Sequence, residues 1–223
     1  MAKNEDARLK IIAFGDSTTA YAEDVCVYTE LIKKKLIDSD IQEEVINSGI
    51  KLNTSADAVN RLAKDVILHK PAITIVQFGI NDSAVDVWKE PPATQPRVDI
   101  EQYEQNIRYI VQRLRDNGSK IVLMSSNPLL WTDLLKKMYG KHPYNVDDVD
   151  GMNVLLKNYV QRLIYIAKEL KLPYIDIYSA HKSDNDWCGG KYLLDGIHPN
   201  NAGHRLVVDN LWPILYSMLR PEK

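Results

Sequence analysis

Hydrophobic residues along the chain form two alternating patterns. Short, continuous runs rich in Ile and Val are typical of strands buried on both faces of a parallel sheet. Longer stretches between them repeat apolar residues at helical spacing and predict amphipathic helices. The predicted strands are Leu9–Phe14, Val45–Asn47, Ile73–Phe78, Ile121–Ser125 and Tyr174–Ile177, and the helical patterns are Val25–Leu36, Ala56–Val66, Tyr103–Leu114, Leu155–Leu170 and Leu206–Leu215.

This alternation predicts an α/β fold with helices on both faces of the sheet. Right-handed crossovers favour a three-layer α/β/α, flavodoxin-like, doubly wound sheet of about five parallel strands. A chain of 223 residues fits one such domain, spanning residues 1–223. Asp99 is expected to cap the helix that follows it, with Gln102 reaching back in a capping box.

Two connections between the predicted elements are long. Ser83–Val98 contains three prolines, and Ser126–Asp150 carries apolar residues at helical spacing. Long connections in compact domains are often functional or mobile, and a short helix that packs down fits the second one equally well. The apolar residues are Trp131, Leu134, Leu135 and Met138.

The charge balance argues against some partners. A net charge of −2 provides no strong field for nucleic acid or an anionic membrane. Lys33-Lys34-Lys35 is the only basic run and is interpreted as a solvated helix face. No apolar stretch is long enough to span a bilayer. Met1–Lys10 is polar and lacks the apolar core of a leader, so we expect a cytoplasmic protein, although a trimmed leader would leave the same sequence.

The cysteines and histidines do not suggest a metal or a cofactor. Cys26 and Cys188 lack metal-type spacing, and we expect reduced thiols. Four histidines are scattered without the helical spacing of a zinc site, so no metal is predicted. Of these, His181 and His204 are interpreted as surface or hydrogen-bonded histidines. The four are His69, His142, His181 and His204.

Residues suited to acyl transfer follow the predicted strands. Sites in doubly wound sheets lie beyond the carboxyl ends of the strands. The motifs there supply a serine, a histidine, a carboxylate, an amide and glycines, which are the parts of a nucleophile, a base and an oxyanion hole. Each motif alone is a weak signal, because Gly-Asp-Ser also suits a helix cap. The motifs are Gly15-Asp16-Ser17, Asn47-Ser48-Gly49, Gly79-Ile80-Asn81-Asp82 and Asp195-Gly196-Ile197-His198.

In this order and spacing, the motifs resemble the blocks of the SGNH hydrolases, the GDSL-type lipases and esterases. The resemblance covers essentially the whole chain. It implies that Ser17 is the nucleophile, His198 the general base and Asp195 the carboxylate that orients His198. It also implies an oxyanion hole made of the Ser17 and Gly49 backbone N–H groups and the Asn81 side-chain amide.

The sequence departs from the family at one position. Many members carry a further glycine three residues after Gly49, where this chain has Leu52, so the approach of substrate to that loop is altered. Asp16 and Asp82 are expected to support their turns rather than perform chemistry. Tyr21, Trp131 and Trp187 are expected to contact substrate, although Trp187 and its neighbour Tyr192 also suit the edge of the core.

The resulting hypothesis is a cofactor-free serine esterase for small or carbohydrate O-acyl esters, above all O-acetyl esters. Polar loops around Asn53, Asn127, Asp184 and Asn185 are expected to bind hydroxyl groups. The expected partner is a small-molecule or glycan ester, with neither nucleic acid nor stable membrane insertion, and the oligomeric state is open.

Alternatives remain at this point. A lysophospholipase or thioesterase for longer acyl chains would use the apolar residues of Ser126–Asp150 as a lid. A non-enzymatic, flavodoxin-like domain would bind a phosphate or flavin at Gly15–Thr19, although that loop lacks the glycine spacing and lysine of a P-loop. Cys188 is a weaker rival nucleophile, because no partner is evident for it.

Overall fold

The structure, a computed structural model, describes residues 8–220. Most of the polar N-terminal segment on which the expectation about a leader rested therefore lies outside the described residues. Five parallel strands form one sheet in the order β2-β1-β3-β4-β5. This is the order of flavodoxin-like sheets, and the predicted fold class is confirmed. The strands are β1 (Lys10–Gly15), β2 (Glu44–Gly49), β3 (Ile73–Gln77), β4 (Lys120–Met124) and β5 (Tyr174–Ile175).

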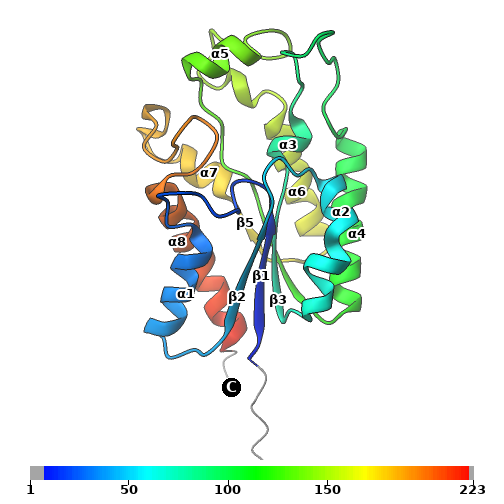
Figure 1. Cartoon of the computed structure of the whole chain (residues 1–223), viewed down its shortest axis with the longest axis vertical. Coiled ribbons are helices and arrows are strands. Elements are labelled where there is room, and N and C mark those ends of the chain that lie inside the picture. The colour runs from blue at the N-terminus through cyan, green and yellow to red at the C-terminus, as the bar shows by residue number, and fades with distance from the viewer. Residues whose placement is uncertain (1–7, 221–223) are drawn as a thin grey trace, which may run out of the picture.

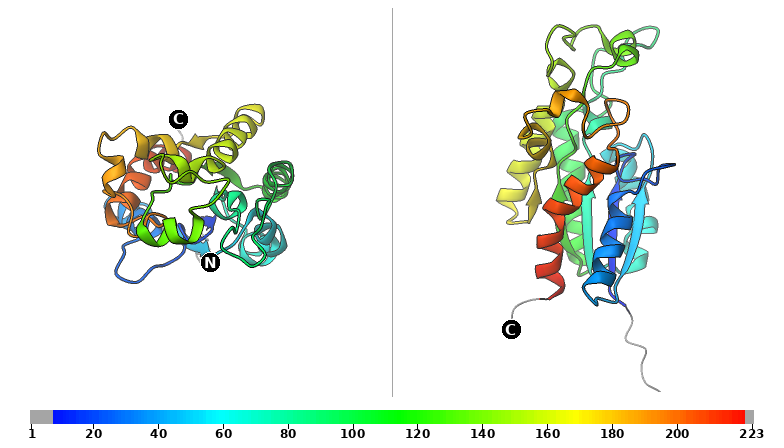
Figure 2. Two further views of the ribbon diagram at one scale, coloured as in Figure 1. Left: turned by 90° about the horizontal axis from the view of Figure 1, so that it is seen from above. Right: turned by 90° about the vertical axis from the view of Figure 1, so that its left-hand side faces the viewer.

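Helices cover both faces of the sheet (Figures 1 and 2). Alternate side chains of β1 enter different cores, because neighbours along a strand point to opposite faces. Ile12 and Phe14 pack with α2, α4 and α6, whereas Ile11 and Ala13 pack with α1, α7 and α8. The helices are α1 (Tyr28–Asp38), α2 (Ser55–Asp65), α3 (Ile80–Ser83), α4 (Ile100–Asp116), α5 (Asp133–Tyr139), α6 (Leu156–Glu169), α7 (Ile177–Lys182) and α8 (Asn201–Leu219).

The element boundaries differ from the predictions where side chains cap a helix. β5 ends at Ile175, earlier than predicted, because Asp176 caps α7 and accepts a hydrogen bond from the Ser179 N–H at 2.9 Å. Asp99 caps α4 as predicted, at 2.8 Å from the Gln102 nitrogen. The Gln102 side chain does not reach back, because its amide donates to Asn106 Oδ1 one turn further on. The predicted capping box is therefore only half formed.

The pattern that begins at Val25 also starts too early. α1 begins at Tyr28, and Val25 instead forms an isolated antiparallel bridge with Ala22. The apolar spacing in 126–150 does form a short helix, α5, which lies beyond the carboxyl ends of the strands (Figure 1). Within residues 8–220, none of the helices has the length and apolar character needed to cross a membrane.

Candidate active site

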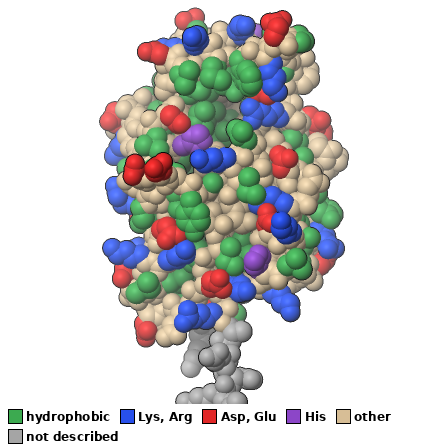
Figure 3. Space-filling view, in the orientation of Figure 1, with side chains coloured by type: hydrophobic (Ala, Val, Ile, Leu, Met, Phe, Trp, Pro, Cys, Tyr) green, Lys and Arg blue, Asp and Glu red, His purple; other side chains and the backbone are tan. Residues whose placement is uncertain are grey.

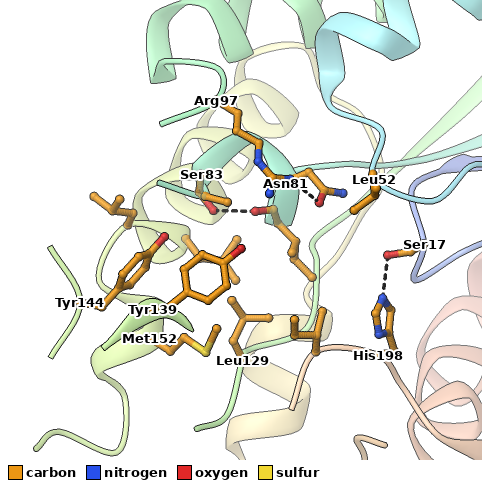
Figure 4. A pocket seen from close by; sticks show the side chains of 15 residues that line it. Ser17, Leu52, Asn81, Ser83, Arg97, Leu129, Tyr139, Tyr144, Met152 and His198 are labelled. Atoms are coloured by element: carbon orange, nitrogen blue, oxygen red, sulfur yellow. Dashed lines mark hydrogen bonds between the residues drawn. The ribbon is translucent and has the colours of Figure 1, made fainter. Parts of the chain in front are cut away.

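The serine, histidine and carboxylate of the predicted triad form one hydrogen-bonded chain. His198 Nε2 lies 2.9 Å from Ser17 Oγ, and His198 Nδ1 lies 2.7 Å from Asp195 Oδ2 (Figure 4 shows the first contact). An ionised carboxylate only accepts hydrogen bonds, so Nδ1 carries the ring proton and Nε2 is left to accept the serine hydroxyl. This is the tautomer that a general base needs.

Asp195 is held as an anion. Burial alone would raise the pKa of this carboxyl, but hydrogen bonds from the His198 ring and from two backbone N–H groups lower it below its usual range. The backbone donors are Ile197, at 3.0 Å, and His198, at 2.8 Å. The turn that presents them requires glycine at position 196, because φ is +87° and a Cβ would meet the Leu130 carbonyl oxygen at 2.4 Å. The local sequence Asp-Gly-Ile-His therefore builds the base together with its orienting group.

Buried carboxyl groups stabilise the backbone around Ser17 by accepting hydrogen bonds. Asp16 is fully buried, and its Oδ1 accepts from the Thr18 N–H at 2.9 Å and the Thr18 hydroxyl at 2.8 Å. Asp82 is also buried and accepts the Ser55 N–H at 2.8 Å, at the start of α2. The Asp16 contacts agree with the expectation that this carboxyl group supports its own turn, whereas Asp82 holds the start of α2.

Arg61 connects the strand ends around the serine, and sequence reasoning missed it. Its guanidinium donates to the carbonyl oxygens of Gly15, at 2.8 Å, and Ser48, at 2.9 Å, and to Asn53 Oδ1, at 2.6 Å. The guanidinium carbon also lies 4.4 Å from the centroid of the Phe14 ring. An arginine within a helical pattern gave no signal of these contacts, because the partners named above come from β1, β2 and the connection after β2. Only Asp65, at 3.2 Å from Arg61 Nη1, lies on the same helix.

The Asn81 amide is oriented toward the same site. Its Nδ2 donates to the Asn53 carbonyl oxygen at 3.0 Å, and its Oδ1 accepts from Arg97 Nη1 at 3.2 Å. An amide nitrogen carries two protons, so one of them remains for an oxyanion. Asn81 lines a cavity together with Ser17 and His198.

The structure does not favour Gly49 as an oxyanion donor. Its N–H already donates to Asn47 Oδ1 at 2.9 Å. A Cβ at Gly49 would lie 2.3 Å from the Ala20 nitrogen, so glycine serves the close packing of β2 against the serine turn. Leu52, the departure from the family pattern, has a left-handed φ of 65° and lines the cavity beside Ser17 and Asn81. Within residues 8–220, the Leu52 N–H has no hydrogen-bond partner.

Two cavities flank the Ser17–His198 pair, and Leu52 lines both of them. The first, of about 110 Å³, is the more enclosed and is mostly apolar. The second, of about 400 Å³, is more open and lies against the serine turn and the start of α8. The enclosed cavity is further lined by Ile80, Asn81, Ser83, Ala84, Arg97, Leu129, Tyr139, Tyr144, Met152, Leu155, Leu156 and Ile197, and the open cavity by Ala20, Ala22, Lys51, Leu194, Asp195, Pro199 and His204.

The two long connections build the wall of the enclosed cavity jointly. Tyr144 Oη accepts from the Val85 N–H at 2.8 Å, and Trp88 Nε1 donates to Tyr139 Oη at 3.2 Å. The two tyrosine rings meet edge to face at 5.6 Å between centroids. Figure 4 shows both rings beside the cavity, and Figure 3 shows hydrophobic side chains gathered on the same upper part of the molecule.

The three residues expected to contact substrate line neither cavity. Tyr21 is exposed, and its hydroxyl lies 3.5 Å from Lys33 Nζ. Trp131 donates to backbone carbonyl oxygens at residues 145 and 148 and packs edge-on against Tyr144, so it supports the wall from behind. Trp187 lies under Lys182 Nζ, 4.8 Å from the ring centroid. Which aromatic rings line a cavity depends on contacts that sequence spacing does not reveal.

The polar residues expected to bind hydroxyl groups are engaged elsewhere. Asn53 accepts from Arg61, Asn127 donates to the Ile197 carbonyl oxygen at 2.9 Å, and Asp184 pairs with Lys191 at 2.6 Å. None of them lines either cavity. Our expectation of a hydroxyl-binding rim made of these residues is therefore not met.

His204, by contrast, lines the open cavity, and its contacts agree with the interpretation of a hydrogen-bonded histidine. It is buried, and its Nδ1 accepts from the Tyr28 N–H at 3.2 Å. Burial, with a smaller contribution from nearby His181, lowers the pKa of His204 to about 4. Burial also lowers the pKa of His181, which contacts the Ile177 carbonyl oxygen at 2.9 Å. Neither histidine lies on the surface.

The remaining candidate groups are unremarkable. Cys26 and Cys188 are exposed and form no disulfide in the part of the chain that the structure describes. Across residues 8–220, no group of three or more His, Cys, Asp or Glu side chains is arranged to hold a metal ion. In the predicted lid, Leu135 is buried while Leu134 is exposed, so α5 packs one side onto the core.

Comparison with known proteins identifies the class. The model of the GDSL-like lipase/acylhydrolase family matches residues 13–206. The chain therefore belongs to this family, a class of ester hydrolases, and the resemblance to SGNH hydrolases is confirmed.

Relatives and solved structures agree with this assignment. A GDSL esterase/lipase of Arabidopsis thaliana is 28% identical over 69% of this chain and 63% of its own length. The chain thus spans less than two thirds of that relative. A lipase/acylhydrolase from Enterococcus faecalis has the same fold, with a TM-score of 0.74 at 22% identity, covering 96% of this chain and 99% of the other. A mutant acetyl-xylooligosaccharide esterase from a Geobacillus species superimposes with a TM-score of 0.72 at 21% identity, covering 96% and 95%.

Proposed function

We propose that this protein is a serine ester hydrolase with Ser17 as nucleophile, His198 as general base and Asp195 as the group that orients His198. The observation that carries the proposal is the continuous chain of hydrogen bonds from Ser17 Oγ through His198 to Asp195. Hydroxyl, imidazole and carboxylate in this geometry are the arrangement that activates a serine. A phosphate- or flavin-binding role for Gly15–Thr19 would leave this chain of contacts without a purpose.

The reaction proceeds in two balanced steps. His198 Nε2 takes the hydroxyl proton as Ser17 Oγ attacks the ester carbonyl carbon, and the carbonyl oxygen becomes an oxyanion. The tetrahedral intermediate collapses, the C–O bond to the alcohol breaks, and the protonated His198 gives its proton to the departing alkoxide. Water then attacks the acyl-enzyme and gives a proton to His198, and Ser17 recovers that proton as the carboxylic acid leaves.

The oxyanion is held by the Ser17 N–H, the free proton of Asn81 Nδ2 and a backbone N–H from the connection after β2. We assign this last role to Leu52 in place of Gly49. The Gly49 N–H is bound to Asn47, whereas the Leu52 N–H has no partner in the described residues and its residue lies beside Ser17 and Asn81. Fixed donors of this kind stabilise developing charge without reorganisation.

The enclosed cavity supports a short acyl group. Its volume of about 110 Å³ is smaller than the cavities of about 150 Å³ that accept benzene. Acetyl to butanoyl groups fit this space, and the open cavity of about 400 Å³ then receives the alcohol. The similarity to an acetyl-xylooligosaccharide esterase supports an acetylated sugar as one such ester. A long acyl chain would require the wall at Tyr139 and Tyr144 to open.

A chain-length series tests both parts of this proposal. Wild-type protein and the Ser17→Ala variant are assayed on p-nitrophenyl esters from acetate to decanoate. We expect highest kcat/KM at acetate to butanoate, and a loss of about 10⁴-fold or more in kcat in Ser17→Ala. Retention of most activity by Ser17→Ala would refute the mechanism, whereas a maximum at decanoate would refute only the short acyl group.

A further inference from the structure

Arg97 lies directly behind Asn81, in the wall of the enclosed cavity (Figure 4). Arg97 comes from the connection between α3 and α4, and backbone hydrogen bonds join the two ends of this connection. The Arg97 N–H donates to the Ala84 carbonyl oxygen at 3.0 Å, and the Val98 N–H donates to the Asp82 carbonyl oxygen at 3.1 Å. Arg97 Nη1 donates to Asn81 Oδ1 at 3.2 Å. The backbone thus holds the guanidinium against the amide.

Asp86 fixes the other side of the guanidinium. Its carboxylate accepts from Arg97 Nη2 at 2.7 Å and from Arg97 Nε at 3.1 and 3.2 Å, and it is almost fully buried. Burial alone would lower the pKa of Arg97, but the hydrogen bonds and charge of Asp86 raise it. Asp86 therefore orients a permanent cation, and two contacts in a fork restrict its rotation.

The Arg97–Asp86 ion pair leaves only one favourable orientation for the Asn81 side-chain amide. Its oxygen faces the guanidinium, and its nitrogen faces the Asn53 carbonyl oxygen. A flipped amide would place N–H groups against the cation and an oxygen against the Asn53 carbonyl oxygen, leaving both contacts repulsive. Hydrogen bonding of an amide oxygen to a cation also polarises the amide, which strengthens its N–H as a donor.

We propose that Arg97 is a positioning residue for the oxyanion hole, acting through Asn81 by presenting and polarising its Nδ2–H group. This inference rests on the proposed function, because it requires an oxyanion beside Asn81. It assigns Arg97 no contact with the reacting atoms. Removal of the guanidinium therefore slows the acylation step and leaves the binding of a small neutral ester almost unchanged.

Steady-state kinetics on p-nitrophenyl acetate test this role. We expect Arg97→Met to lower kcat about tenfold, less than the loss of a whole oxyanion donor, with KM changed by about twofold or less. Arg97→Lys, which keeps a cation, is expected to recover part of the loss. Lys89→Ala is the matched control, because Lys89 Nζ contacts the same Asp86 carboxylate at 2.8 Å from the exposed side and makes no contact with Asn81. Its kcat is expected to equal that of wild type.

A double-mutant cycle separates positioning from a merely structural role. In the Asn81→Ala background, Arg97→Met is expected to cost about twofold or less, since the residue through which it acts is gone. An equal loss in both backgrounds would overturn the proposal, as would a raised KM with unchanged kcat, which would mean that Arg97 binds the substrate. If the proposed function itself is wrong, the Ser17→Ala variant keeps the activity of wild type. This outcome is distinct from any failure of the Arg97 proposal. If Arg97→Met does not fold, Arg97→Lys provides the same cycle, with a smaller expected loss in the wild-type background.

Discussion

The two cavities beside Ser17 differ in the parts of the chain that build them. The open cavity is formed by the serine turn, Leu194 and the start of α8, close to the residues of the triad itself. The enclosed cavity is formed by residues from two long connections that meet through Tyr144 and Val85. The reactive end of the site is thus attached to the sheet, while the cavity that we assign to the acyl group takes much of its wall from the long connections. Chemistry and acyl selectivity should therefore respond to different substitutions.

The cavities also differ in the titratable groups that line them. The enclosed cavity carries the ion-paired guanidinium of Arg97, whereas the open cavity carries His204, whose buried ring has a lowered pKa. A cation stands behind the oxyanion donor, and a neutral imidazole lies on the side assigned to the alcohol. The open cavity is also lined by Asp195, the carboxylate paired with His198, so charged groups support the proposed reaction from both sides.

Asn81→Ala should produce the largest change on the enclosed side. Removing one oxyanion donor is expected to lower kcat by about 10²–10³-fold on p-nitrophenyl acetate. The measurement is kcat and KM with the thermal unfolding midpoint as a control for folding. A folded variant that keeps wild-type kcat would mean that the oxyanion is stabilised without Asn81.

His204 should make the open side sensitive to acid. Its folded pKa of about 4 lies below the ordinary value of 6.5, so the unfolded chain binds the proton more readily between these values. The stability contributed by the neutral ring is present above pH 6.5 and is lost as the pH falls toward 4. The shift corresponds to about 3 kcal/mol in the free energy of unfolding.

Urea titrations of wild type and His204→Asn from pH 4 to 8 test this expectation. The stability of wild type relative to the variant should rise with pH up to about 6.5 and then stay level. The difference between the two proteins isolates His204 from Asp82, whose pKa burial raises to about 6 and which therefore acts in the opposite direction. A difference that is independent of pH would contradict the assignment.

Tyr139→Ala should show that acyl selectivity depends on the enclosed cavity and not on the open one. Removing the ring enlarges the enclosed cavity, so kcat/KM for the octanoate ester relative to the acetate ester is expected to rise about tenfold. Leu194→Ala is the matched variant on the open side and should leave this ratio unchanged. If both variants changed the acyl preference equally, the assignment of acyl group and alcohol to separate cavities would be wrong.

The smallest expected effect concerns Leu52. Leu52→Gly keeps the N–H and suits a φ of 65°, so kcat is expected to stay within about threefold of wild type. Leu52→Val places a β-branched residue where φ is positive, and kcat is expected to fall about fivefold or more. Equal activities of the two variants would indicate that the backbone at Leu52 does not take part in the reaction.

The sequence was informative where function depends on local motifs. Short apolar runs located the five strands that the structure describes, and right-handed crossovers favoured a flavodoxin-like sheet. The arrangement of Asp195 and His198 is set by a turn of four residues, and the predicted roles of the two residues came from the resemblance to SGNH hydrolases. The Gly49 N–H donates to the Asn47 side chain, a partner that sequence does not reveal, and for this reason our proposal moves the predicted donor role to Leu52.

The residues that form the wall of the enclosed cavity could not be predicted from the sequence. Tyr139, Tyr144 and Arg97 carry no motif and reach Ser17 only through the folding of two long connections. Trp131 was expected to contact substrate, yet it packs behind Tyr144 and not in the cavity. A helical pattern in 126–150 was visible, but the face that it buries depends on contacts with α6 and the connection after α3.

The most direct measurement is labelling with a fluorophosphonate probe, followed by identification of the modified peptide. The probe forms a covalent bond only with a serine whose hydroxyl is activated by a neighbouring base. We expect a single modified residue, Ser17, and loss of the label in His198→Ala, which keeps the hydroxyl but removes the base. Labelling of another residue, or labelling that persists without His198, would contradict the assignment of Ser17 as the nucleophile.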